Sequence, residues 1–314
     1  MNSIEKNFIG REKEIIFLKE CGDFRDRGID TPIINFYGIS GIGKSELLTM
    51  IERTSDDSVH SILLRPVFGF GLPYFFVSKL CEVLNSRLDW NFPRVGFLLA
   101  RIAQLDWINH VTLPNYFLLE NGLLPDDVDR FSDNIKEFLI SVSGRDWRNT
   151  FWGLERKDIV DLLPNALCFD IEDVFKDSGF KFIRLLIDDA DKIYGLPIDW
   201  LLKFTICFPR VQLVFVTERS IDNVVSMQKI ICREILPFNR NELHKLFMLN
   251  GLDFYIVEDL LNEEIDISIP RTAKMVIEIV KSNRIDDLKN VSNFEELYKL
   301  FWNILSNEEK KILV

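Results

Sequence analysis

The strongest constraint on this chain is a glycine-rich segment, GISGIGKS, at residues 38–45. It matches the pattern GxxxxGK[ST], follows a short apolar run at residues 32–37, and precedes a helical pattern from Lys44 to about Arg53. A strand, a glycine loop and a helix in this order open a βαβ unit whose loop binds phosphate. The alternative, a glycine turn beside an incidental lysine, is disfavoured because the whole motif stands in its required context.

Each residue type in this loop has a defined task. Its three glycines permit backbone angles that other residues avoid, so that N–H groups can surround the β-phosphate. Lys44 is expected to bridge β- and γ-phosphate oxygens, and the Ser45 hydroxyl to ligate a magnesium ion. The expected cofactors are therefore ATP or ADP and Mg²⁺. The cofactor-binding positions that we assign here are Gly38, Gly41, Ile42, Gly43, Lys44, Ser45 and Glu46.

A second chemical feature is an acidic cluster where an apolar strand ends, in FIRLLIDDADK at residues 182–192. We assign Asp188 to the metal, through water, and Asp189 to orienting or deprotonating the attacking water. Asp191 is expected to be solvated. Standing alone, this segment would be an acidic turn at the end of a strand. Beside a phosphate loop, the catalytic interpretation is favoured.

A third feature ends the apolar run VQLVFV at residues 211–216, which is followed by Thr217 and Arg219. Ligands bind at the carboxyl ends of parallel strands, and arginine can bind phosphate through two hydrogen bonds. Thr217 and Arg219 are therefore candidates for sensing the γ-phosphate, with Arg219 included among the catalytic residues. A surface ion pair of Arg219 with Glu218 or a helix carboxylate is an equally good interpretation.

Strand and helix patterns alternate in the first three quarters of the chain. This alternation predicts an α/β fold, a mainly parallel sheet covered on both faces in a P-loop NTPase core. Besides residues 32–37, the strand candidates are residues 61–68, 182–188, 211–216 and 230–236.

An aromatic-rich helical insertion is expected at about residues 88–158. It contains four tryptophans, at positions 90, 107, 147 and 152. Clustered aromatic residues can form a partner surface, but more often they form the core of a helical subdomain, and we favour the core.

After Pro237 the strand patterns stop and a small all-helical domain is expected, so we divide the chain into residues 1–237, 238–305 and 306–314. The segment NRNELHKLFML begins with Asn239 and Glu242 spaced as a capping box, and its apolar residues recur at helical spacing. Two later pairs have the same N-cap and N3 spacing, namely Ser292 with Glu295 and Ser306 with Glu309. The last pair starts a helix that the chain end cuts short.

Composition disfavours several classes of function. The chain has 314 residues, with 38 basic and 49 acidic side chains and a net charge of −11, which repels nucleic acid and anionic lipid. Five cysteines without a CxxC pair and three histidines indicate neither a disulfide framework nor a zinc site. No apolar leader or membrane-length run is present, so a soluble, cytoplasmic protein is expected.

Together these motifs resemble the STAND signal-transduction ATPases, a class in the AAA+ branch of P-loop proteins that includes NB-ARC modules. The resemblance covers most of residues 8–283 outside the insertion. The segments that carry it, in order, are FIGREKEIIFL (8–18), FYGISGIGKSELL (36–48), LLIDDAD (185–191), VFVTERS (214–220) and LPFNRNELHKLF (236–247).

The resemblance implies further site residues. Four residues, Phe8, Ile9, Gly10 and Arg11, would lie over the adenine. Arg219 matches the arginine of a T-x-R strand. Pro270 would contact the nucleotide from a Gly-x-Pro turn, although Ser268 replaces the glycine here. Residues 306–314 resemble the start of a winged-helix domain.

By the same resemblance, the chain is expected to be a nucleotide switch with slow ATP hydrolysis. ADP would hold the two domains together, and ATP exchange would permit self-association. Sensor and effector domains are expected in the full-length protein, which would serve signalling or defence against phage. The alternatives are an origin-recognition-like or archaeal-type AAA+ DNA-binding ATPase, and a scaffold with a decayed site.

Overall fold

The computed structural model describes most of the chain. The described residues are 9–26, 33–54, 59–65, 73–106, 133–144, 146–177, 182–192, 210–221 and 230–313. Phe8 and Trp107 lie outside these ranges. None of the helices in these ranges is long and apolar enough to cross a membrane.

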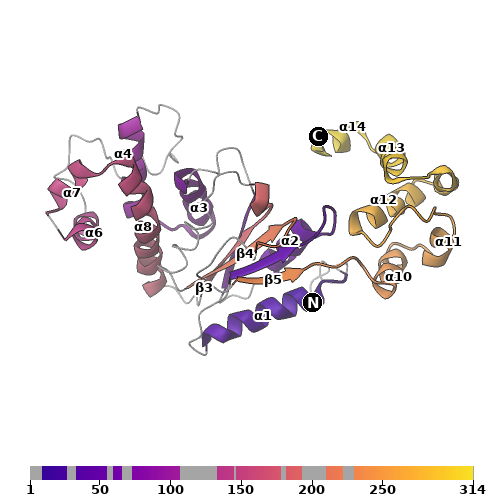
Figure 1. The fold of residues 1–314 in the computed structure, drawn as a ribbon, viewed down its shortest axis with the longest axis horizontal. Coiled ribbons are helices and arrows are strands. Elements are labelled where there is room, and N and C mark those ends of the chain that lie inside the picture. Colours follow the sequence, from indigo (N-terminus) through magenta and orange to yellow (C-terminus); the bar gives the residue numbers. More distant parts are fainter. Residues whose placement is uncertain are drawn as a thin grey trace.

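A five-stranded parallel sheet forms the centre of the described α/β part (Figure 1). Its order is β2-β3-β4-β1-β5, and every pairing between neighbours is parallel. The strands are β1 (Ile33–Tyr37), β2 (Val59–Leu64), β3 (Phe182–Ile187), β4 (Val211–Thr217) and β5 (Ile230–Glu234). The five predicted strands are therefore confirmed, with shifts of a few residues at their ends. Since they are parallel, the carboxyl ends of β1, β3 and β4 meet at one edge.

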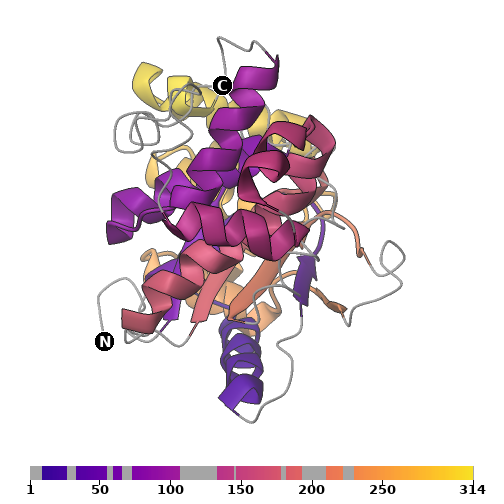
Figure 2. The same ribbon diagram turned by 90° about the vertical axis from the view of Figure 1, so that its left-hand side faces the viewer.

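Helices cover both faces of this sheet (Figures 1 and 2). Two helices, α1 (Glu12–Asp26) and α2 (Lys44–Arg53), share a core with Leu186, Val214 and Val216. The opposite face packs against a helical layer. That layer consists of α3 (Pro73–Leu88), α4 (Pro93–Asp106), α6 (Asp133–Ser143), α7 (Trp147–Gly153) and α8 (Arg156–Asp177). Burial on both faces explains why the central strands are apolar without alternation.

The helical layer contains the predicted aromatic insertion. Trp90 is 6% exposed and packs edge-on against Phe175, with ring centroids 5.6 Å apart. Trp147 packs against the same core. For these two residues the core interpretation holds. The layer's helices begin at Pro73 and continue to Asp177, beyond both ends of the expected segment.

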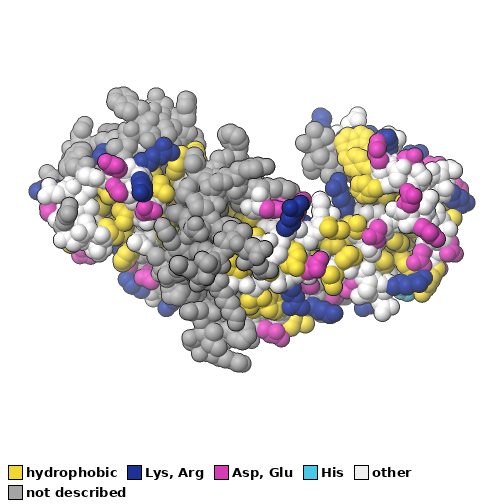
Figure 3. All heavy atoms as spheres, viewed as in Figure 1, with side chains coloured by type: hydrophobic (Ala, Val, Ile, Leu, Met, Phe, Trp, Pro, Cys, Tyr) yellow, Lys and Arg dark blue, Asp and Glu magenta, His cyan; other side chains and the backbone are white. Residues whose placement is uncertain are grey.

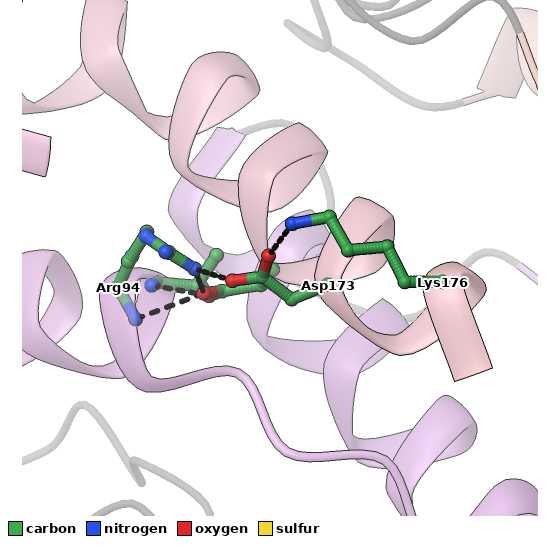
Figure 4. A network of polar contacts seen from close by, with 5 residues as sticks. Arg94, Asp173 and Lys176 are labelled. Carbon is green, nitrogen blue, oxygen red and sulfur yellow. Dashed lines mark hydrogen bonds and ion pairs between the residues drawn. The ribbon is translucent and has the colours of Figure 1, made fainter. Parts of the chain in front are cut away.

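A buried ion-pair network joins two helices of this layer (Figure 4). Arg94, at the start of α4, donates through Nη1 to Asp170 Oδ1 at 2.9 Å and to Asp173 Oδ2 at 2.8 Å, both on α8. Asp170 also accepts from the backbone N–H groups of Arg94 and Val95. Lys176 donates to the second oxygen of Asp173. The network therefore caps α4 and fixes it on α8.

The chain continues into C-terminal helices with a separate apolar cluster. They are α10 (Arg240–Leu249), α11 (Phe254–Glu258), α12 (Pro270–Lys281), α13 (Phe294–Ile304) and α14 (Asn307–Leu313), with a 3₁₀ turn, η4 (Ile285–Asn290), before α13. In the space-filling view a notch separates the α13–α14 end from the part containing the sheet (Figure 3).

The helix starts in this region test the predicted caps. The Asn239–Glu242 capping box is present, and Ser306 and Glu309 exchange hydrogen bonds at the start of α14. The Ser292–Glu295 prediction is wrong by one residue. Asn293 is the N-cap of α13 and accepts from the backbone N–H of Glu296. The Glu296 carboxylate then accepts from the backbone N–H and the hydroxyl of Ser292, whereas Glu295, the predicted N3 residue, pairs with Lys299.

Candidate nucleotide-binding site

The glycine loop connects β1 to α2 at the carboxyl edge of the sheet. Gly41 and Gly43 have φ angles of 81° and 91°, in the left-handed region that favours glycine. Gly38 does not share this conformation, contrary to our expectation. Its glycine is needed for space, since a Cβ there would lie 3.0 Å from the carbonyl oxygen of Ile235. Glycine is thus required at positions 41 and 43 for the backbone conformation, and at position 38 for lack of space for a side chain.

Lys44 begins α2 and is 7% exposed. Its ammonium donates to the carbonyl oxygens of Gly38 at 2.8 Å and Ile39 at 3.1 Å. The positive charge is thereby held against the loop, next to the N-terminal end of the helix. Both features favour an anion at this position. Ser45 and Glu46 follow in the first turn and are exposed, while Ile42 is buried beneath the loop.

The acidic cluster meets the loop at the end of β3. The Asp188 carboxylate is 5% exposed and lies beside the Ser45 hydroxyl. Burial raises the pKa of Asp188, against the lowering effect of the Ser45 side chain. Asp189 has a φ of 44°, which is uncommon for a residue other than glycine, and its N–H donates to Asp188 Oδ1. Two carboxylates and a hydroxyl thus lie at the same edge of the sheet.

Asp191, in the 3₁₀ turn η3 (Ala190–Lys192), is exposed, as expected for a solvated side chain. It has a partner as well, since its Oδ2 accepts from the backbone N–H of Glu218 at 2.9 Å. Asp191 therefore links the ends of β3 and β4.

At the polar end of β4, the two predicted sensor residues, Thr217 and Arg219, lie in different environments. Thr217 is 1% exposed, and its hydroxyl donates to the Arg219 carbonyl at 2.6 Å while accepting from the Asn35 amide at 2.8 Å. The Thr217 side chain therefore shapes the turn. Arg219 is exposed, and among the described residues it forms no ion pair. The surface ion pair with Glu218 is not seen in this part of the structure.

The N-terminal segment lies against the loop and the start of the C-terminal helices. Gly10 has a φ of 77°, and a Cβ there would lie 2.8 Å from the Phe238 ring. Ile9 is half-buried. These two residues occupy a tight position between elements, but Phe8, which was assigned with them to the adenine, lies outside the described residues.

Arg11 is a buried arginine whose side chain joins three segments. It is 5% exposed, and it donates to the carbonyl oxygens of Ile42 at 2.7 Å and of Gly10 and Leu236 at 3.0 Å. Its guanidinium lies 5.1 Å from the centre of the Phe238 ring. Burial lowers the pKa of Arg11, with Glu14 and Glu242 acting in the opposite direction. The guanidinium therefore fixes the loop relative to the linker after β5, a role that the sequence did not indicate.

The N-terminus of α12 abuts the glycine loop. Pro270 is the first residue of α12, and its Cγ would lie 3.9 Å from a Cβ on Gly43. The backbone N–H of Arg271 donates to the Gly41 carbonyl at 3.1 Å. A Cβ on Gly41 would lie 2.9 Å from Arg271 Cβ. Pro270 is therefore close to the loop, as the resemblance implied.

Arg271 is a residue that sequence reasoning missed. Its guanidinium lies 6.0 Å from the centre of the Tyr298 ring on α13. Its place at the loop arises from a contact between residues far apart in the sequence, so no local signal identifies it.

The strand order and the phosphate loop define an AAA+-like P-loop fold with C-terminal helices. No protein-family model and no curated protein sequence matches the chain. Solved structures resemble it at low similarity. The ORC1 protein of Aeropyrum pernix, solved in complex with DNA, has 14% identity and a TM-score of 0.45, over 95% of this chain and 66% of that one.

Two further structures are similar over most of the chain. RuvB, a Holliday junction branch migration motor of Thermotoga maritima, has 14% identity and a TM-score of 0.37, over 98% of this chain and 75% of that one. PCH-2 of C. elegans has 10% identity and a TM-score of 0.37, over 98% and 72%. Similarity at this level carries no argument about function, which has to come from the site.

Proposed function

We propose that this chain is an ATP/ADP-binding switch module with slow, Mg²⁺-dependent ATP hydrolysis. One observation carries the proposal. The Asp188 carboxylate, at the end of a different strand, lies beside the Ser45 hydroxyl in the first turn after the glycine loop, and the Lys44 ammonium is held against the same loop. A strand-end carboxylate beside the hydroxyl and lysine of a phosphate loop is the arrangement that nucleotide hydrolysis requires.

The residues present fit both parts of Mg-ATP. The left-handed glycines and the start of α2 suit a phosphate chain, and a Cβ on Gly41 would collide with Arg271. Ser45 and Asp188 offer the oxygen ligands that Mg²⁺ prefers. When bound, the ion would neutralise charge on the β- and γ-phosphates.

The chain's own residues would divide the remaining tasks. Lys44 would bind phosphate oxygens in place of its present carbonyl partners. Asp189, half-buried beside Asp188, is the group that would orient the attacking water and take its proton. Thr217 would act indirectly, by shaping the turn that carries Arg219.

The switch follows from the contact between α12 and the loop. Because the Arg271 N–H donates to the Gly41 carbonyl, a conformational change in the loop would act directly on the start of α12. A γ-phosphate would add charge contacts in one arrangement only, so ATP and ADP would have different affinities for two states. Self-association in the ATP state, sensor and effector domains, and a role in signalling or antiphage defence are the wider proposal, supported by the resemblance to STAND ATPases.

The test is to denature the purified protein and to identify the nucleotide released. We expect ADP from the native chain and none from Lys44→Ala, because the lysine charge is lost. Lys79→Ala, at an exposed lysine of α3, is the matched control and should retain ADP. Equal nucleotide content in all three proteins would contradict the proposal. Salt-sensitive binding of duplex DNA would favour the DNA-ATPase alternative.

A further inference from the structure

The turn at the end of β4, residues 217–221, is held by side chains from two other segments, the 3₁₀ turn η3 and strand β1. On one side, Asp191 after β3 accepts from the backbone N–H of Glu218 at 2.9 Å. On the other side, Asn35 of β1 accepts through Oδ1 from the backbone N–H of Ile221 at 3.3 Å. Within the turn, the Thr217 hydroxyl donates to the Arg219 carbonyl. The backbone around Arg219 is therefore fixed from outside as well as from inside.

Asn35 is the central part of this arrangement. It is 0% exposed in the middle of β1, paired in register with Phe215 on β4 and Cys232 on β5. Its Nδ2 donates to the Thr217 hydroxyl at 2.8 Å, so both ends of the amide bond the turn. Burying an amide among apolar neighbours is costly unless it is hydrogen-bonded, and here both bonds go to one segment.

A second buried amide in the same sheet shows what is special about Asn35. Gln212 of β4 is also 0% exposed, but its Oε1 accepts from Arg184 on β3, and its Nε2 has no hydrogen-bond partner among the described residues. It lies near the start of β4, away from the turn, and by strand alternation it points to the opposite face. Gln212 serves packing between strands, whereas Asn35 serves the turn.

The strand that carries Asn35 also leads into the glycine loop. The first loop residue, Gly38, donates its backbone N–H to the Thr217 carbonyl at 3.2 Å. The loop and the turn are therefore joined twice, through this backbone bond and through Asn35. Such a connection fixes the position of the Arg219 backbone relative to the loop.

We infer that Asn35 is a positioning residue, which holds the 217–221 turn in register with the glycine loop so that Arg219 can distinguish ATP from ADP. This inference rests on the proposed function. It assigns Asn35 a role through Arg219 without any contact of its own with nucleotide.

The test compares Asn35→Leu with Gln212→Leu and Arg219→Ala. The first measurement needs no nucleotide. Hydrogen exchange at the Glu218 and Ile221 amides should be at least about tenfold faster in Asn35→Leu, because their protection depends on the turn, and unchanged in Gln212→Leu. The second measurement is the ratio of ATP to ADP affinity. It should fall about tenfold in Asn35→Leu and in Arg219→Ala, with no further fall in the double variant.

Unchanged exchange in Asn35→Leu, or an unchanged affinity ratio while Arg219→Ala lowers it, would overturn the inference and leave the proposed function intact. Absence of nucleotide binding in the native chain would instead overturn the proposed function. If Asn35→Leu does not fold, Thr217→Val, which keeps the shape but removes the bridging hydroxyl, replaces it with the same expected results.

Discussion

Two buried arginines, Arg11 beside the glycine loop and Arg94 in the helical layer, differ in their hydrogen-bond partners. Arg11 donates only to backbone carbonyl oxygens, and no carboxylate of the described residues lies within ion-pair distance of it. Arg94 is bonded to two carboxylates, one of them wholly buried. In the helical layer the charge of Arg94 is paired directly with carboxylates, whereas beside the loop the charge of Arg11 is offset only by the more distant carboxylates of Glu14 and Glu242. The ion-paired Arg94 stabilises the protein, whereas a positive charge beside the loop suits an anionic ligand.

The largest expected effect comes from removing Arg94. Arg94→Ala should lower the free energy of unfolding by about 3–5 kcal/mol, since Asp170 would be left buried without its ion pair. Urea denaturation measures this loss. The comparison fails if Arg94→Ala is as stable as the native chain, or if it loses nucleotide affinity while keeping its stability.

The next largest effect is expected at Lys44 in the glycine loop, where nucleotide affinity rather than stability should fall. Lys44→Ala should reduce ADP affinity at least about 100-fold and change the stability of nucleotide-free protein little, because its ammonium is held against carbonyl oxygens of the loop, where phosphate would bind. Calorimetric titration and urea denaturation give the two numbers. A large loss of stability without loss of affinity would place Lys44 in the same class as Arg94.

A smaller effect is expected at Arg11. Arg11→Lys should weaken ADP binding about tenfold, because one ammonium cannot reproduce the fork that bonds Ile42 and Leu236. The measurement is again calorimetric titration. Arg233→Lys, at an arginine that stacks on Phe17 of α1, is the matched control and should bind normally. Equal affinities in the two variants would remove Arg11 from the positioning of the loop.

The last effect, read as a slope rather than as a single loss, is a pH dependence within the Arg94 network. Burial raises the pKa of Asp170 to about 7, despite opposing hydrogen bonds from Val95 and Arg94. Burial also raises the pKa of Asp173, but the bonds from Lys176 and Arg94 outweigh it, so its pKa is lowered. The folded state thus binds the Asp170 proton more tightly than the unfolded state does. The contribution of Asp170 to the free energy of unfolding therefore falls as pH rises from about 4 to 7.

The two carboxylates should therefore respond to pH with opposite sign. Relative to Asp170→Asn, the native chain should lose stability between pH 5 and 7. Relative to Asp173→Asn, it should gain stability as pH rises through the acid range, where Asp173 ionises. Thermal unfolding over pH 3.5–8 measures both, and the same sign for both variants would contradict the account.

Local signals predicted most of the fold. The five strands, the α2 helix and two of three caps depend on short apolar runs, glycines and N-cap side chains, which act within a few residues. The prediction of Ser292 as N-cap failed because its neighbour Asn293 is an equally favourable N-cap residue, so residue preference alone could not decide between them. The extent of the helical layer was missed because α3 and α8 lie outside the aromatic-rich stretch.

Candidate site residues could be assigned from the sequence only where they belong to a local motif. Lys44, Ser45 and Asp188 are assigned in this way, and their roles stay predictions. Asn35 and Arg271 belong to no such motif, because their importance arises from contacts with residues far along the chain. Arg11 was found by resemblance, but only the structure shows its side chain under the loop.

The central claim is that the loop and the acidic cluster bind a nucleotide. It is tested most directly by thermal unfolding of nucleotide-stripped protein with and without ADP, or Mg-ATP, at about 100 times the expected dissociation constant. Binding at this level adds about 2.7 kcal/mol, so the Tm should rise by several degrees in the native chain and not in Lys44→Ala. An unchanged Tm of the native chain with both nucleotides would contradict the account.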